Sequence, residues 1–109
     1  MANTFKLKSK NNIGVSTVGI YTVPASTTTV IIGVTAANIS GQGINVGIGI
    51  SRATNGDDIN ILKNVPIPQG SALEIKQGNK IVVEAADTVT AKSDVNSTLD
   101  VALTIMEIT

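Results

Sequence analysis

The sequence predicts an all-β protein, and three observations carry that prediction. Val, Ile and Thr are abundant, and β-branched residues favour strands. Short segments of alternating apolar and polar residues recur along the whole chain, separated by turn residues. Aromatic residues make up only 2% of the chain, so a core must be built from Val, Ile, Leu and Ala. A single domain over residues 1–109 is expected, with about eight antiparallel strands in a β-sandwich (Ig-like or jelly-roll-like) or a small barrel.

The N-terminal segment, residues 1–12, is basic. It carries Lys6, Lys8 and Lys10 and no acidic residue, and their alternate spacing places all three on one face of a strand. One interpretation is an edge strand whose lysines discourage pairing with further strands. The alternative is an N-terminal arm that contacts an acidic neighbouring subunit.

The other strands follow from the same period of two. They are expected over residues 13–23, 28–37, 44–51, 59–65, 73–76, 80–85, 88–92 and 99–108. The segment 28–37 is apolar or small on both faces, which predicts a central strand. Asn55-Gly56 predicts a hairpin between two strands. Gln77-Gly78-Asn79 predicts a second hairpin, which joins 73–76 to 80–85.

Two glycines lie on one face of the strand with the most regular alternation. In residues 44–51, Gly47 and Gly49 alternate with Ile48 and other apolar residues. Glycine weakens a strand and often marks a bulge or the close approach of another backbone. Either a bulge with packing inside the chain or a contact with another subunit explains the pair.

The residue types needed for most chemistry are missing. The chain has no Cys and no His, so it lacks thiolate sites, the commonest general base and the commonest transition-metal ligand. Asn55 to Asp58 has the composition of a hairpin turn and matches no calcium loop. Charge pairing with Lys76 and Lys80 across the predicted hairpin explains Glu74 and Glu84 better than paired-acid catalysis does. We therefore expect no enzymatic activity, no catalytic residue, no metal and no cofactor.

Charge and hydropathy argue against nucleic-acid-binding, membrane-spanning and exported proteins. Eight basic residues balance eight acidic ones, which argues against nucleic-acid binding because that requires a basic surface. No run approaches the roughly 18 apolar residues of a membrane span. The N-terminus has no apolar signal-peptide core, so synthesis in the cytoplasm without export by that route is expected.

The strands carry more apolar surface than one sandwich buries. A two-layer sandwich covers one face of each sheet, yet the alternation places Ile31, Val82, Met106 and Ile108 on outer faces. An apolar patch of this kind is unusual on a monomer. The sequence therefore predicts burial against a partner, and a closed homo-oligomer is the commonest form.

Three segments resemble small virion proteins of tailed, cyanophage-like phages. They are Thr17-Val18-Gly19-Ile20-Tyr21-Thr22-Val23-Pro24-Ala25 with the threonines and apolar strand that follow, residues 62–73, and residues 80–89, together with the ending Met106-Glu107-Ile108-Thr109. The resemblance covers most of the chain but rests on turns and strand patterns, with no catalytic residues to transfer. It implies a β-sandwich capsid decoration (cement) protein, often trimeric, located in the virion.

The leading hypothesis is therefore a homo-oligomer, expected as a trimer, that binds the major capsid protein or another virion protein. The candidate interface residues are Lys6, Lys8, Lys10, Ile31, Gly47, Gly49, Val82, Met106 and Ile108. A tail, fibre or baseplate module is the first alternative. A carbohydrate-binding module is a further one, although sugar sites usually present aromatic platforms and this chain has only Phe5 and Tyr21. No nucleic acid and no membrane is expected as a partner.

Overall fold

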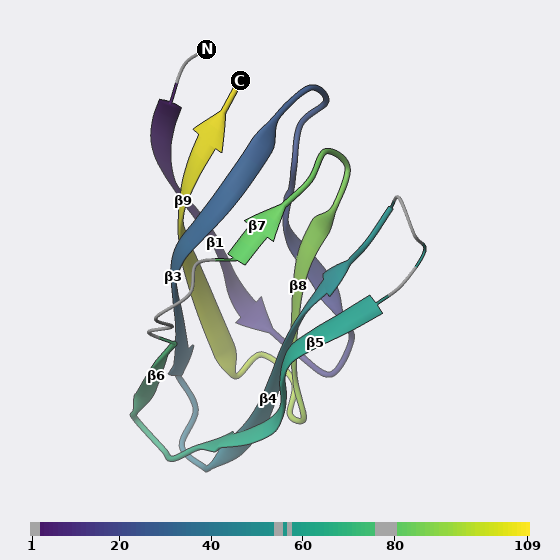
Figure 1. Cartoon of the computed structure of the whole chain (residues 1–109). Helices are drawn as coiled ribbons and strands as arrows, with labels where there is room; N and C mark the ends of the chain where they lie inside the picture. The colour runs from purple at the N-terminus through teal and green to yellow at the C-terminus, as the bar shows by residue number, and fades with distance from the viewer. Residues whose placement is uncertain (1–2, 54–55, 57, 76–80) are drawn as a thin grey trace.

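The computed structural model describes residues 3–53, 56, 58–75 and 81–109 (Figure 1). All regular structure in these residues is β-strand, which confirms the all-β prediction. The strands are β1 (Asn3–Ile13), β2 (Val18–Thr22), β3 (Thr28–Asn38), β4 (Ile44–Ser51), β5 (Asp58–Ile67), β6 (Ala72–Ile75), β7 (Ile81–Val83), β8 (Thr88–Ser93) and β9 (Leu99–Ile108). The described residues include no helix long and apolar enough to cross a membrane.

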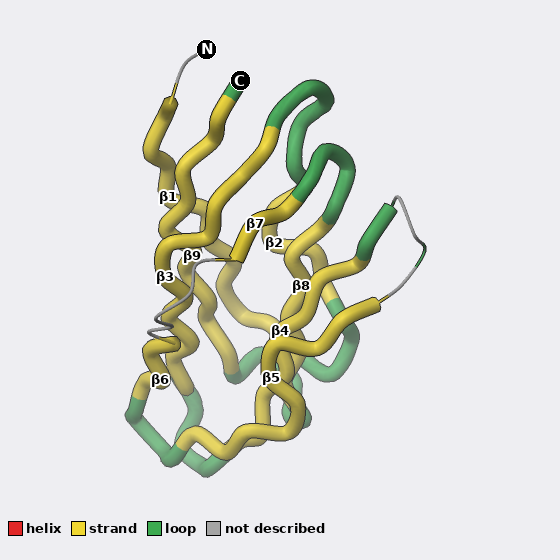
Figure 2. The backbone as a smooth tube through the Cα atoms, in the orientation of Figure 1, coloured by secondary structure: helices red, strands yellow, loops and turns green. Residues whose placement is uncertain are grey.

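The strands form two antiparallel sheets that pack as a sandwich. One sheet has the order β1-β9-β3-β6, with β7 also paired to β3, and the other has the order β2-β8-β4-β5. Because β6 and β7 occupy the place of one interrupted strand beside β3, the order is that of an eight-stranded jelly roll. Figure 2 shows the five-stranded sheet on the left and the four-stranded sheet on the right. The sheets remain separate, so the small barrel that the sequence left open is not formed.

Two expected elements differ from the structure. Residues 13–23 contain a break, because β1 ends at Ile13 and β2 begins at Val18. The predicted hairpin over residues 73–85 is wrong, because β6 and β7 both pair with β3, one after the other along its length. The residues expected to form that turn, 77–79, lie outside the described residues.

The hairpin between β4 and β5 is confirmed. The two strands pair antiparallel from Ile44 opposite Ile67 to Ser51 opposite Asp58. In the connection Gly56 has a φ of 72°, a left-handed conformation that glycine adopts without a steric cost. Asn55, on which the prediction also depended, lies outside the described residues.

A bulge in β3 reverses the alternation that the sequence suggested. Ile31 was expected on an outer face, but it is 4% exposed and lies in the core. The pairing of β3 with β9 is irregular between Ile31 and Gly33, so the inward positions change from odd to even numbers there. Ile32 consequently points outward and is 38% exposed. The central position of β3 in its sheet is confirmed.

The core fills the space between the inner faces with aliphatic side chains. In β9, Leu99, Val101, Leu103 and Ile105 are all buried, as the alternation predicted. The one aromatic side chain in the core is Tyr21, which is 6% exposed. The jelly roll is therefore packed with Val, Ile, Leu and Ala, as the composition required.

An ion-pair cluster fixes the loop before β8. Asp87 is fully buried, and its carboxylate accepts the backbone N–H groups of Ala53 and Glu84 at 3.1 and 3.0 Å. Arg52 lies with its Nε 2.9 Å from Asp87 and donates to Glu84 at 2.6 Å. These contacts join the end of β4 to the β7–β8 connection. A buried carboxylate requires such compensation, since burial without it is costly.

Candidate interaction surface

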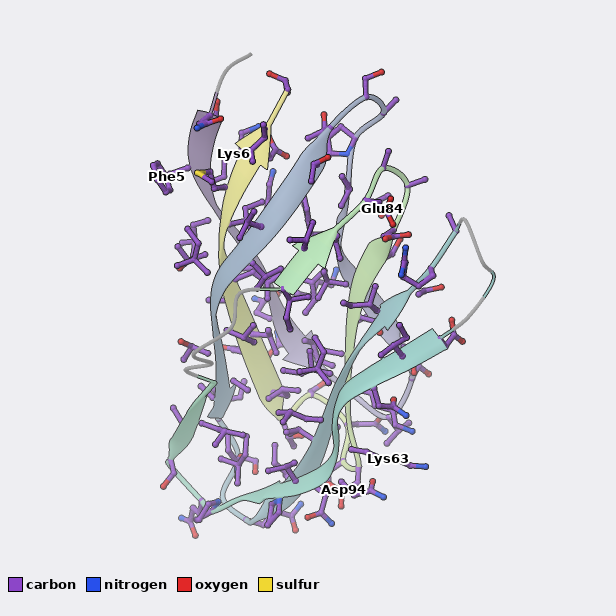
Figure 3. The ribbon with its side chains drawn as sticks, viewed as in Figure 1. Phe5, Lys6, Lys63, Glu84 and Asp94 are labelled. Carbon is purple, nitrogen blue, oxygen red and sulfur yellow. The ribbon has the colours of Figure 1, made fainter. Side chains whose placement is uncertain are left out.

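The first strand presents lysines to one side and apolar residues to the other. In β1, Lys6 and Lys8 lie opposite Ile105 and Leu103 of β9, whose side chains point into the sandwich. Paired residues on antiparallel strands share a face, so the lysines lie on the inner side. Phe5 and Leu7 consequently lie on the outer side of the sheet. Figure 3 shows the Phe5 ring projecting away from β1 and from the rest of the molecule.

The inward lysines find partners inside this chain. The Lys6 ammonium lies 2.7 Å from Glu107, whose side chain is only 7% exposed. The Tyr21 hydroxyl donates to the other oxygen of Glu107 at 2.5 Å and lies 2.8 Å from the Thr29 hydroxyl. The Lys8 ammonium lies 5.8 Å from the centre of the Tyr21 ring, within the range of a cation–π contact. Lys6 thus has an acidic partner within the chain, Glu107, and the alternative of a contact between the lysines and an acidic neighbouring subunit stays a prediction.

This network shifts the pKa values of its two acids in opposite directions. The hydrogen bond from Lys6, followed by that from Tyr21, holds the pKa of Glu107 below its ordinary value. Burial, followed by the hydrogen bond to Glu107, raises the pKa of Tyr21 to about 12. The carboxylate is therefore charged and the phenol neutral at neutral pH. The contacts among Lys6, Glu107 and Tyr21 anchor the start of β1 to β2 of the second sheet, and they determine which side of β1 faces outward.

The outward side of the sheet carries an apolar ridge. Cross-strand pairing aligns Phe5, Met106, Val30 and Val82 in one row across β1, β9, β3 and β7. Phe5 is 69% exposed and Val82 is 58% exposed, while the other two are half-buried. We call these four residues the apolar ridge. Leu7, in the next row of β1, is 67% exposed.

Farther along the same face lies a shallow hollow. Its lining includes the small residues Ser9, Thr35, Ala37 and Ala102 together with Asp100, and we call it the small-residue hollow. Ser9 and Thr35 flank Ala102 in the sheet, four residues along the strands from the apolar ridge. Ridge and hollow thus lie on one face, displaced from each other along the strands.

Charge on this face is confined to its hollow end. The outward positions of β1, β9, β3 and β7 that the structure describes hold one ionisable side chain, Asp100, which lines the small-residue hollow, and in β6 Glu74 pairs with Thr35 of the same hollow. Asp100 accepts the backbone N–H of Asn12 at 2.9 Å. The lysines of β1 are turned to the other side. Interfaces between proteins are depleted of charge at their centres in the same way.

The predicted interface residues fall into separate groups. Val82, Met106 and Ile108 lie on this outer face, whereas Ile31 is in the core. The sequence reasoning missed Phe5 and Leu7, the two most exposed large apolar residues of the described chain. Their alternation with the lysines was the signal that could have identified them. Lys10 lies opposite the buried Val101 and so belongs to the inner side, as the two other lysines do.

Gly47 and Gly49 lie on the other sheet, and packing within the chain accounts for Gly49. A Cβ atom on Gly49 would lie 2.6 Å from the carbonyl oxygen of Ile59 in β5. One on Gly47 would lie 3.5 Å from the carbonyl oxygen of Leu62, an ordinary contact. The pairing of β4 with β5 is irregular at both glycines, which is the bulge considered above. A subunit contact through these residues stays a prediction.

No constellation for metal chemistry is present in the described residues. They contain no group of three or more acidic, His or Cys side chains placed to hold a metal ion. Glu84, one of two acids considered as a pair, binds Arg52 in the β7–β8 connection. Lys76 and Lys80, its expected cross-strand partners, lie outside the described residues.

Comparison with known proteins identifies the fold. No family model and no curated protein matches the sequence. A subunit of the disulfide-linked pili of Bacillus endospore appendages matches in structure with a TM-score of 0.58 and 14% identity, over 99% of this chain and 87% of that one.

Two viral chains match in the same way. A chain of the acid-stable capsid of Helicobacter pylori bacteriophage KHP30 matches with a TM-score of 0.58 and 9% identity, over 100% and 94% of the two chains. A chain of the infectious bursal disease virus particle matches with a TM-score of 0.59 and 9% identity, over 96% of this chain but 30% of that one. These likenesses show that the chain has the jelly-roll fold found in capsid proteins and pilus subunits.

Proposed function

We propose that this chain is a non-enzymatic structural subunit of a phage virion, and specifically a capsid decoration (cement) protein. It assembles with copies of itself and binds the major capsid shell, which it stabilises through protein–protein contacts. The single observation that carries the proposal is the outer face of the five-stranded sheet. This face exposes large apolar side chains on β1 and β7, and no described element of the chain covers it.

The physical reason is the cost of leaving this face in water. Phe5 and Leu7 on β1 and Val82 on β7 each expose more than half of their surface, and the half-buried Met106 and Val30 lie between them on β9 and β3 of the same sheet. Contiguous apolar surface of this kind marks interaction sites on soluble proteins. Burial releases roughly 25 cal/mol per Å² of apolar area, which favours assembly without a chemical step. The jelly-roll fold, shared with chains of capsids and pili, supports the proposal.

A fibre or appendage subunit is the second candidate, and it includes the tail, fibre or baseplate role considered from the sequence. The likeness to the Bacillus endospore pilus subunit over 99% of this chain favours it. The disulfide link named for those pili has no counterpart here, because the printed sequence contains no Cys. A sugar-binding role is less well supported, since Tyr21 is buried and only Phe5 remains as an exposed aromatic ring.

The decisive experiment is to locate the chain and count its copies. Purified protein is mixed with empty phage capsids, and bound protein is measured after sedimentation and then placed by cryo-electron microscopy. The proposal predicts saturable binding at fixed positions on the shell and a higher temperature of capsid disruption. Density restricted to a tail or fibre would promote the second candidate. Failure to bind any part of the particle would contradict both.

A further inference from the structure

We propose that two copies of the chain pack through the outer face about a two-fold axis, with the apolar ridge of each copy seated in the small-residue hollow of the other. The inference deepens the assembly function proposed above and rests on it. It names the partner of the outer face as a second copy and fixes the register of the contact.

The first argument is shape. Along β9, Met106 in the ridge and Ala102 in the hollow are four residues apart, or about 13 Å at the usual strand rise. Thr104 lies midway, opposite Leu7. A two-fold axis that lies between the faces, crosses the strands at right angles and passes Thr104 superposes ridge on hollow and hollow on ridge. Both complementary parts are therefore present once on each copy, as a self-complementary contact requires.

The second argument is charge. A two-fold contact brings like surfaces together, so charged groups near the axis meet their own kind and repel. The rows nearest the axis avoid this, because Leu7, Thr104 and Gly33 carry no charge. The two ionisable residues of the face lie away from the axis: Asp100 lines the hollow, and Glu74 pairs with Thr35 there. A strongly charged partner would find no complementary groups here. The chain's formal net charge of zero also leaves little long-range repulsion between copies.

The third argument is area. Four adjacent strands with the length of β9 cover about 500 Å² per copy, from strand spacings of about 4.8 Å and rises of about 3.3 Å. Side chains standing on the sheet increase the accessible area toward the roughly 600–800 Å² that each partner buries in a specific complex. The face is thus large enough for a stable dimer, and it contributes the Phe5 ring and the Met106 side chain, residue types that are enriched in interfaces.

Engineered thiols test the register directly, because the printed sequence has no native Cys. Thr104→Cys places a thiol beside the proposed axis, and Thr28→Cys places one on the same face in the row of Ile108. A bis-maleimide that spans about 10 Å, the spacing of packed sheets, is added at low protein concentration. We expect Thr104→Cys to cross-link to itself at least tenfold faster than Thr28→Cys. Equal rates would contradict the proposed axis, as would faster cross-linking of Thr28→Cys.

A mixed experiment tests the contact between ridge and hollow. Met106→Cys protein mixed with Ala102→Cys protein should yield more cross-linked pair than either variant alone, because the two positions face each other across the axis. Ile59→Cys, in an exposed position on the edge strand β5 of the other sheet, serves as the matched control. Cross-linking of the control at the same rate as the mixture would overturn the inference.

An equilibrium measurement provides a second readout. Leu7→Glu places a charge in the row of the axis, and we expect the dimer dissociation constant to rise at least tenfold. Val15→Glu, at a 52% exposed residue between β1 and β2, should leave the constant unchanged. Circular dichroism checks that both variants remain folded. If Leu7→Glu unfolds, Ala102→Arg replaces it, because an arginine at position 102 would occupy the hollow that receives the ridge of the partner. Loss of dimer in the Val15 variant alone would contradict the inference.

The two proposals fail separately. A chain that binds capsids but does not form this dimer would contradict the inference and leave the proposed function standing. A chain that forms the dimer but binds no part of the particle would do the reverse.

Discussion

Glu107→Gln tests the network that holds the first strand. In the folded protein Glu107 accepts hydrogen bonds from Lys6 at 2.7 Å and from Tyr21 at 2.5 Å, and its side chain is 7% exposed. Glutamine keeps an acceptor for the phenol but loses the charge. A hydrogen bond to a charged group contributes about 1.5–3 kcal/mol, and the half-exposed Lys6 lowers its share. We expect the free energy of unfolding to fall by about 2 kcal/mol, or roughly 8–16 °C in Tm for a chain of this size.

The pH dependence separates the charge from simple loss of packing. The folded-state pKa of Glu107 lies below its ordinary value of 4.5, so its contribution is complete above that pH and is lost as the pH falls through the folded-state pKa. The difference between wild type and Glu107→Gln should therefore be large at pH 7 and shrink toward zero in acid below the folded-state pKa.

Urea unfolding followed by circular dichroism measures this difference. Lys10→Met is the control, because Lys10 forms no ion pair that the structure records in the described residues. Its stability should lie within about 0.5 kcal/mol of wild type. A difference between wild type and Glu107→Gln that does not change between neutral and acid solution would refute the reasoning, as would one below 0.5 kcal/mol.

Three further predictions concern the interior. Tyr21 is the single tyrosine, so the ultraviolet absorbance of tyrosinate should show one transition, near the pKa of about 12. The stability that the neutral phenol contributes should be lost as the pH rises from about 10 through that pKa, and an absorbance transition at pH 10 would contradict the prediction. Asp87→Ala should lower the unfolding free energy by about 3 kcal/mol in urea, because it removes the buried acceptor of the Ala53 and Glu84 backbone N–H groups and one of the two carboxylates that bind Arg52. Glu84→Ala, at an exposed carboxylate, should cost less than about 1 kcal/mol. Gly49→Ala should lower the free energy of unfolding by about 1–3 kcal/mol, measured by thermal unfolding, because its Cβ would lie 2.6 Å from a carbonyl oxygen. Gly33→Ala is the control: a Cβ there would meet no atom within 4 Å, so stability should be unchanged or increased.

Much of the fold follows from local pattern. The strand Leu99–Ile108 and its inward face were predicted with the observed bounds, because a strict period of two over ten residues leaves no other arrangement. The hairpin between β4 and β5 followed from its turn residues. Pairing partners are a different matter, because register and neighbours depend on the whole sheet. The connection expected to fold β6 back on β7 instead leaves both strands on β3.

The candidate surface shows the same limit. Val82, Met106 and Ile108 were placed outward by alternation alone. Ile31 was misplaced, because the bulge between Ile31 and Gly33 exchanges the two faces of the strand, so the alternation through Val34 and Ala36 does not extend back to Ile31. The alternation of lysine with Phe5 and Leu7 marked two faces, but which face is inside depends on Glu107, about a hundred residues away.

The mass of the purified chain in solution tests the central claim most directly. Light scattering coupled to size exclusion, over a wide range of concentrations, should give a particle of at least two chains of 11.2 kDa, with three expected from the resemblance to cement proteins and two from the outer face. The same measurement on Leu7→Glu should show the mass falling toward one chain. A monomer at every concentration, with the outer face intact and the protein folded, would contradict the account.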